Sequence, residues 1–342
     1  MAQGLGLAAL MTAGLVIGAH SAIADDVSDF YKGKTINFII GSGPGAGYDI
    51  YGSLTARALV KHIPGSPDFL PRNMPGASSR TAAAHVYNIA PKDGLTLCMV
   101  NQELPLAQVL GEKFQFDAAQ FNWIGTPDTD NRVVMTWHAS GVRTIEDAKK
   151  KEVTMGTSGP TEASGYPDML NILTGTRFKT ITGYNSGAAI HLAMERGEVD
   201  GRASNAWESW KGDHAEWLRD KKIHPIVQVG LVKVPDLPDV PLLMDLAPTP
   251  ESREAIKLIS SSTMFGHPVV VAPGVPEARV TALRAAFDAA MADPTVLADA
   301  EKQRRPIRPV SGVALQKIVA EMLAAPQNVR DRAIALTHEK KL

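Results

Sequence analysis

The stretch "TINFIIGSGPGAGYDIYGSLTARALVKHI", Thr35 to Ile63, decides the fold. It reads as a buried strand that ends at Gly41, a glycine-rich turn, and a helix for which Asp49 is placed as a cap. Pro64 and Gly65 then end the helix. Because a helix N-terminus presents free backbone N–H groups and a partial positive charge, this layout predicts a cradle for a phosphate or a carboxylate.

The rest of the chain repeats the alternation of strand and helix. Apolar runs typical of buried strands are "LTLCMV" at 95–100, "VVMTW" at 133–137, "EVTMG" at 152–156 and "IHPIVQVG" at 223–230. Segments with helical spacing lie between them and fill the last part of the chain. The length of 342 residues suits about two domains. We therefore expect an α/β protein with mostly parallel sheets that helices cover on both faces.

The N-terminus and the composition indicate export. Leu5 to Gly18 is almost wholly apolar, and Ala22-Ile23-Ala24 has the small-x-small pattern of a signal-peptide cleavage site, although no Lys or Arg precedes it. A membrane anchor is the alternative, but the apolar run is shorter than the roughly 20 residues a span needs. Cys98, the one cysteine, is expected to be a core residue. The net charge of −1 gives no footprint for nucleic acid.

The same turn also permits an alternative interpretation, in which the protein is a nucleotide-dependent enzyme. Residues 41–46 fit G-x-G-x-x-A, a variant of the dinucleotide fingerprint, and Asp68 follows about 20 residues on. Asp68 lies in a proline-rich loop, however, and Pro44 removes one backbone donor from the cradle. No other catalytic motif is present, and the acidic run at 128–131 lacks the glycine and distal glutamate of a calcium loop. We expect no catalytic residue, no cofactor and no metal.

A second loop, "GTSGPTEASG" at 156–165, has the same strand-loop-helix setting in the other half of the chain. Two such loops facing one another across a cleft would hold the two ends of a small acid. Simple helix capping by Ser or Thr is the alternative for this loop.

Six segments in order carry a resemblance to a known family. They are "YKGKTINFIIGSGPGAGYDIYGSLTARALVKHI", "RNMPGASSRTAAAHVYNIAPKDGLTL", "MGTSGPTEASGY", "YNSGAAIHLAMERGEVDGRASN", "VPDLPDVPLL" and "VVVAPGVPEARVTALRAAFDAAMADP". Together they resemble the periplasmic solute receptors of tripartite tricarboxylate transporters, the Bug or TctC-like family, over about Tyr31 to Ala324. The first loop departs from the family, since glycines replace bulkier residues, and Arg202 and Ser204 stand where members often have an aliphatic or aromatic residue and Asp.

The resemblance implies a two-lobed "Venus flytrap" fold, with a small carboxylate held between two α/β lobes and then delivered to a membrane permease. It implies a periplasmic protein without catalysis, expected here to be a monomer. The expected divisions are a signal peptide at 1–24, a first lobe at 25–130 plus 255–342, and a second lobe at 131–254. A ligand-binding partner of a periplasmic sensor is a further alternative.

The expected ligand-binding residues follow from the two loops and from the ends of two strands, where open α/β sheets bind ligands. They are Pro44, Gly45, Ala46, Gly47, Tyr48, Asp49, Asn101, Gln102, Ser158, Thr161, Ser164, Asn205 and Trp207. Asp49 either caps its helix or meets a cationic amine. Arg202 either adds a charge to the site or faces solvent. The rings of Tyr48, Tyr166 and Trp207 either stack on an aromatic acid or simply pack.

Overall fold

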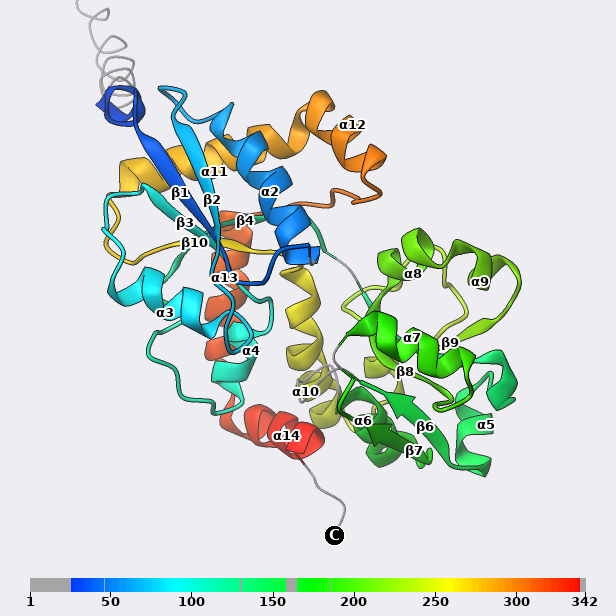
Figure 1. The fold of residues 1–342 in the computed structure, drawn as a ribbon. Coiled ribbons are helices and arrows are strands. Elements are labelled where there is room, and N and C mark those ends of the chain that lie inside the picture. Colours follow the sequence, from blue (N-terminus) through cyan, green and yellow to red (C-terminus); the bar gives the residue numbers. More distant parts are fainter. Residues whose placement is uncertain (1–25, 46, 130, 158–164, 185, 339–342) are drawn as a thin grey trace, which may run out of the picture.

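Two lobes, each built on one β-sheet, make up the protein (Figure 1). The structure is a computed structural model that describes residues 26–45, 47–129, 131–157, 165–184 and 186–338. The expected signal peptide at 1–24 lies outside the described residues. No helix of the described ranges has both the length and the apolar character that a membrane span needs.

The first sheet has the order β11-β4-β10-β3-β1-β2. Its strands are β1 (Thr35–Ile40), β2 (Asp68–Asn73), β3 (Thr96–Met99), β4 (Asn122–Thr126), β10 (Val269–Val271) and β11 (Val310–Ser311). Strand β1 pairs in parallel with β2 and β3, whereas β10 runs antiparallel between β3 and β4. The glycine-rich turn after β1 therefore lies at the carboxyl edge of the parallel strands.

The second sheet has the order β7-β6-β8-β5-β9. Its strands are β5 (Arg132–Trp137), β6 (Val153–Gly156), β7 (Phe178–Ile181), β8 (Gly201–Ala206) and β9 (Ile223–Val229). Strand β6 pairs in parallel with β7 and β8, and β5 runs antiparallel between β8 and β9. Both sheets are mixed, but in each of them most strands run in the same direction, as the sequence predicted. Three strands run against this direction, which the sequence did not predict. They are β5 and β10, each the first strand after the chain crosses from the other lobe, and β11 at an edge of the first sheet.

Helices cover both sheets. Those near the first sheet are α2 (Gly47–Val60), α3 (Arg80–Asn88), α4 (Leu104–Val109), α10 (Pro250–Ser260), α11 (Glu277–Ala292), α12 (Pro294–Lys302), α13 (Gly312–Leu323) and α14 (Gln327–His338). Those near the second sheet are α5 (Ile145–Lys150), α6 (Tyr166–Thr174), α7 (Gly187–Glu195), α8 (Trp207–Asp213) and α9 (Ala215–Arg219). Three 3₁₀ turns are η1 (His138–Ser140), η3 (Leu243–Leu246) and η4 (Ser261–Met264). Helix α14 packs on both α10 and α6, so the C-terminal helix contacts both lobes.

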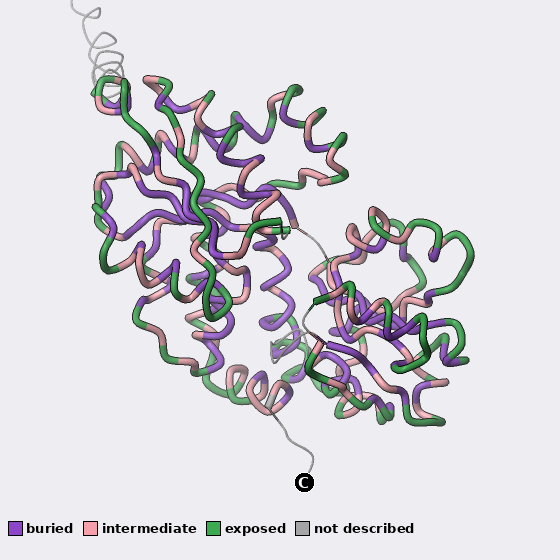
Figure 2. The backbone as a smooth tube through the Cα atoms, viewed as in Figure 1, coloured by how far each residue is buried: buried purple, intermediate pink, exposed green. Residues whose placement is uncertain are grey.

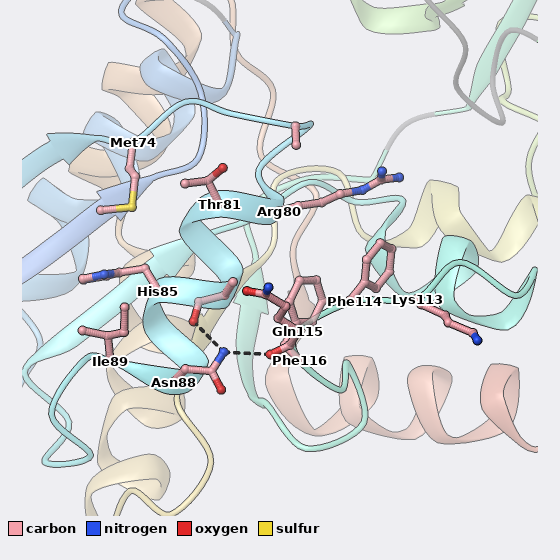
Figure 3. Close-up of a pocket in the computed structure, with 12 residues that line it drawn as sticks. Met74, Arg80, Thr81, His85, Asn88, Ile89, Lys113, Phe114, Gln115 and Phe116 are labelled. Carbon is pink, nitrogen blue, oxygen red and sulfur yellow. Dashed lines mark hydrogen bonds between the residues drawn. The ribbon is translucent and has the colours of Figure 1, made fainter.

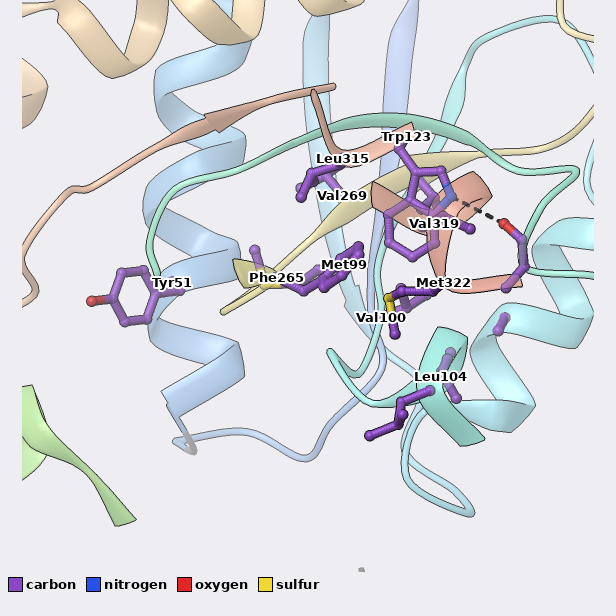
Figure 4. Packing of buried hydrophobic residues seen from close by; sticks show 14 of the residues in the cluster. Tyr51, Met99, Val100, Leu104, Trp123, Phe265, Val269, Leu315, Val319 and Met322 are labelled. Atoms are coloured by element: carbon purple, nitrogen blue, oxygen red, sulfur yellow. Dashed lines mark hydrogen bonds between the residues drawn. The ribbon is translucent and has the colours of Figure 1, made fainter. Parts of the chain in front are cut away.

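The largest cluster of buried apolar side chains extends from the first sheet and its helices into the second lobe, and Figure 4 shows part of it in the first lobe. Trp123 and Phe265 are fully buried, with ring centroids 5.3 Å apart in an edge-to-face contact. Cys98 is buried among apolar side chains, as expected, and this burial raises the pKa of its thiol. The buried residues gather along the sheets, while the edge strand β2 is largely exposed (Figure 2).

The chain crosses between the lobes twice. The first crossing, residues 127–131, leads from β4 to β5, and the return crossing, residues 230–268, leads from β9 to β10 and includes the proline-rich segment 233–250 and α10. The proline-rich segment packs along the second lobe, where the buried Gln228 donates to the carbonyls of Leu237 (2.8 Å) and Val240 (2.9 Å). The loop between α12 and β11 belongs to the first lobe and contacts the first crossing, since the Arg308 N–H donates to the Pro127 carbonyl at 2.9 Å. The crossings meet beside the carboxyl edge of the first sheet.

Candidate functional site

A cavity of about 200 Å³ lies between the two lobes, where the crossings meet. The first lobe contributes the first turn of α2 and Gln102, which follows β3. The second lobe contributes Arg132 at the start of β5 and Asn205 near the end of β8. The crossing segments add Asp128 and His267, and the loop after α12 closes one side. Side chains from distant parts of the sequence therefore converge on one enclosed space.

The turn before α2 is held by Asp49. One carboxylate oxygen accepts from the Gly45 N–H at 2.8 Å, and the other accepts from Asn73 Nδ2 at 2.7 Å. The helix begins at Gly47, so Asp49 lies inside its first turn and is not the N-cap that the sequence predicted. A carboxylate there still suits the positive end of the helix. Both oxygens thus accept hydrogen bonds within the turn, and Asp49 does not line the cavity.

Tyr48 lines the cavity and ties three elements together. Its hydroxyl donates to the Gly266 carbonyl at 3.2 Å and accepts from the Gln102 N–H at 3.1 Å. Burial raises the pKa of Tyr48, so the phenol stays neutral. Its ring packs against His267, with centroids 4.4 Å apart. Tyr48 therefore acts first as a structural tie between α2, the end of β3 and the return crossing.

Two buried carboxamides face the cavity from opposite lobes. Gln102 is 6% exposed and Asn205 is 9% exposed. Among the described residues, neither side chain makes a hydrogen bond, although both line the cavity. Their amide atoms are not among the described polar atoms that are fully buried without a partner, so they reach the open space of the cavity. These two carboxamides are in place to donate to and accept from a small polar molecule.

His267 and Asp128 form a pair at the crossings that the sequence did not reveal. The Nδ1 atom of His267 lies 2.8 Å from Asp128 Oδ1. The His267 ring stacks on the Tyr51 ring, with centroids 4.2 Å apart. Asp128 belongs to the acidic run at 128–131, which lacks the pattern of a calcium loop, and it is only 6% exposed. No cluster of three or more His, Cys, Asp or Glu suited to a metal occurs in the described part of the chain.

Several predicted residues do not line the cavity. Pro44 and Gly45 belong to the turn but lie outside its lining. The Asn101 side chain accepts from the Glu103 N–H at 2.7 Å, directly before the start of α4. Trp207 is buried in the second-lobe core and donates through Nε1 to Asp236 at 2.9 Å. Positions outside the described residues are Ala46, Ser158, Thr161 and Ser164.

Arg202 neither lines the cavity nor simply faces solvent. Its guanidinium packs against Gly187 at the start of α7, and its Nη1 atom lies 2.6 Å from His191 Nε2. His191 Nε2 must accept here, so its Nδ1 carries the proton and donates to His214 Nε2 at 2.7 Å. Burial, helped by the charge of Arg132, lowers the pKa of Arg202 to about 10.

Lowering the pH from 7.5 to 5.0 is expected to reduce the free energy of unfolding through His191. Burial, with the charges of Arg202 and His214, lowers the pKa of His191 to about 3. Since this folded value lies below the unfolded value near 6.5, stability present at neutral pH is lost as the pH falls below about 6.5. The full shift corresponds to about 2 kcal/mol at pH 5, and partial exposure reduces it to about 1 kcal/mol. Burial lowers the pKa of His214 as well, with the same sign.

Urea unfolding at the two pH values measures this loss. The variant His191→Gln is expected to flatten the dependence, whereas His85→Gln in the first lobe serves as the control for loss of a histidine elsewhere. A dependence that His191→Gln leaves as steep as in the parent protein would contradict the assignment.

A larger hollow, of about 740 Å³, lies on the outside of the first lobe between α3 and residues 113–116 (Figure 3). Two of its polar side chains already have partners within the lobe. Arg80 pairs with Glu112, and its guanidinium lies over the Phe114 ring at 5.0 Å. Asn88 Nδ2 donates to the carbonyls of Ala84 (3.0 Å) and Gln115 (2.7 Å). Because one lobe alone forms this hollow, it is a weaker candidate than the cavity between the lobes.

Comparisons with known proteins bear on the fold. No protein-family model matches the sequence, and no curated protein matches it. Among solved structures, a TctC solute-binding protein from Polaromonas without ligand has a TM-score of 0.65 and 18% identity, covering 88% of this chain and 98% of its own. The chain has the fold of a TctC solute-binding protein.

Two further structures of this fold were solved with a bound acid. An R. palustris protein with adipate has a TM-score of 0.61 and 18% identity, covering 88% of this chain and 97% of its own. MatC from Rhodopseudomonas palustris with bound malate has a TM-score of 0.58 and 19% identity, covering 88% of this chain and 99% of its own. The two-lobed α/β fold expected from the sequence is thus confirmed.

Proposed function

We propose that this chain is an exported solute-binding protein that captures a small carboxylate between its two lobes. It would then deliver the carboxylate to a membrane permease of the tripartite tricarboxylate type, without catalysing a reaction. The export, the permease and the expected monomer are parts of this proposal. The division into a first lobe at 25–130 plus 255–342 and a second lobe at 131–254 also belongs to it.

The cavity carries the proposal. Gln102 and Asn205 bring buried carboxamides from opposite lobes, and neither side chain has a hydrogen-bond partner among the described residues. Arg132 lines the same space, and no described carboxylate forms an ion pair with it. The first turn of α2 adds the positive end of a helix of 14 residues. Donors and positive charge from both lobes suit a small anion, and the neighbours with adipate and malate agree with a carboxylate.

The nucleotide alternative has less support. In the dinucleotide-binding arrangement an acidic residue meets the ribose near the glycine-rich turn. Here Asp68 is the first residue of β2 and pairs in register with Thr35, the first residue of β1. It therefore lies at the opposite end of the strands from the turn that follows Ile40. A ligand-binding partner of a sensor would use the same cavity, and only its protein partner distinguishes it from a transport receptor.

A thermal-shift screen of the protein from Asp25 onward tests the proposal. The panel holds malate, adipate, citrate, benzoate, nicotinate, amino acids and NAD. A ligand at 100 times its Kd adds about 2.7 kcal/mol of stability, which is expected to raise the melting temperature by several degrees. A shift with one carboxylate class supports the receptor and names the class. A shift with NAD alone would overturn it. A pulldown from membranes then shows whether the protein partner is a permease or a sensor.

The variant Asn205→Ala is expected to weaken binding of the carboxylate that the screen identifies by about tenfold, since one hydrogen bond contributes about 1.5 kcal/mol. Isothermal titration measures the Kd. Gln115→Ala, in the outer hollow, is the matched control and is expected to leave the Kd unchanged. Equal affinities for Asn205→Ala and the parent protein would contradict the proposal that the carboxylate binds in this cavity.

A further inference from the structure

Arg132 and Arg305 approach the cavity from opposite sides. Arg132 is the first residue of β5 in the second sheet, and Arg305 lies in the loop between α12 and β11, which belongs to the first sheet. No carboxylate in the described ranges forms an ion pair with either guanidinium. The Nε atom of Arg305 is buried and has no hydrogen-bond partner. Arg304 lines the same cavity as a third arginine. Neither Arg132 nor Arg305 thus has an ion-pair partner among the described residues.

The two acidic residues that line the cavity have other partners. Asp128 Oδ1 lies 2.8 Å from His267 Nδ1. Glu208 meets both Lys211, at 3.0 Å, and Arg308. Two guanidinium groups that line one cavity without an ion-pair partner repel each other. Because charges interact more strongly away from bulk water, this repulsion opposes the approach of the lobes when the cavity is empty.

The backbone around Arg305 is fixed to both lobes, so its side chain has a defined place. Tyr51 Oη donates to the Pro306 carbonyl at 3.1 Å, and the Arg308 N–H donates to the Pro127 carbonyl at 2.9 Å. Across the cleft, Arg304 Nη1 donates to the Gly212 carbonyl at 3.4 Å. Arg304 has a φ of +54°, in the left-handed region that favours glycine. This conformation ends α12, because the N–H groups of Arg304 and Arg305 donate to the carbonyls of Glu301 (2.9 Å) and Ala300 (2.8 Å) in a Schellman-type cap.

We propose that Arg132 and Arg305 form an anion clamp across the two lobes, outside the two strand–helix loops that the sequence singled out. A negatively charged group of the ligand would lie between the two guanidinium groups and accept hydrogen bonds from both. Its charge would turn a repulsion that opposes closure into an attraction that favours it, so binding shifts the protein to the closed state. This inference rests on the proposed function for the ligand, but the repulsion itself exists without any ligand.

A double-mutant cycle on the ligand-free protein tests the clamp. Arg132→Gln and Arg305→Gln are each expected to raise the melting temperature by about 2 °C at 20 mM salt, and by nothing measurable at 500 mM. The double variant is expected to gain no more than either single variant, because the first change already removes the repulsion. Arg305→Lys keeps the charge and is expected to show no gain. Arg219→Gln, an exposed arginine paired with Asp220, is the surface control.

Two outcomes would overturn the clamp. Additive gains would mean that the two arginines do not interact, and a lower melting temperature in either single variant would mean that each has a stabilising partner. Sodium sulfate, compared with sodium chloride at equal ionic strength, supplies the anion. It is expected to stabilise the parent protein and Arg219→Gln by more than it stabilises either clamp variant, and equal stabilisation of all four would contradict the clamp. Because neither measurement uses a carboxylate, a failed screen for carboxylates and a failed clamp give different results.

Discussion

Replacing Trp123 with alanine is expected to lower the free energy of unfolding by about 4 kcal/mol, within the range of about 3–5 kcal/mol for truncating a buried tryptophan. The indole is fully buried in the first-lobe core and meets Phe265 edge to face (Figure 4). Its Nε1–H donates to the Ala118 carbonyl at 3.0 Å. Alanine would leave a cavity beside the sheet. It would also leave the Ala118 carbonyl without a donor in an apolar environment.

Urea unfolding followed by circular dichroism measures the loss, because this signal does not depend on the indole that has been removed. Trp123→Phe is the matched variant. It keeps much of the ring packing but loses the donor to Ala118, so we expect a loss of about 1–2 kcal/mol. A loss below about 1 kcal/mol for Trp123→Ala would show that the first-lobe core tolerates the cavity, and would contradict the packing described here.

Local patterns in the sequence predicted much of the fold. The strand at 35–40 and the helix after its turn were predictable because an apolar run, a cluster of glycines and helical spacing follow one another within about 30 residues. Thr144 and Asp147 have the spacing of a helix-capping pair, and Thr144 Oγ1 accepts from the Asp147 N–H at 3.2 Å. Periodicity identifies a strand but not its neighbours. The antiparallel places of β5 and β10 therefore could not be read from it.

Some residues of the candidate site were predictable from the sequence and others were not. Tyr48, Gln102 and Asn205 were found because they lie next to strand ends, where open α/β sheets bind ligands. His267 and Arg305 were missed because they reach the cavity through a crossing and a loop that no local pattern marks. Trp207 directly follows β8, but its ring lies in the second-lobe core and does not line the cavity. Register along a strand was predictable, but the direction of a side chain at its end was not.

Replacing Gly266 with alanine is expected to be the most damaging change at the crossings. Gly266 has a φ of +40°, and a Cβ atom there would lie 2.2 Å from the Asp128 backbone oxygen and 2.5 Å from its Oδ1. The left-handed backbone costs about 1–2 kcal/mol with a side chain, and the overlap adds about 1–3 kcal/mol. We therefore expect the free energy of unfolding to fall by about 3 kcal/mol or more, measured by urea unfolding.

The same change should disturb the cavity, which separates it from a purely local defect. Moving Asp128 breaks its contact with His267, and the Gly266 carbonyl is the acceptor for Tyr48. Binding of the identified carboxylate is expected to weaken more than tenfold. Gly175→Ala is the matched control, because Gly175 has a φ of +76° with no atom within 4 Å of a Cβ. It should lose only the backbone cost of about 1–2 kcal/mol and keep the parent Kd. If both variants lose the same stability, the contact between Gly266 and Asp128 does not hold the two crossings together.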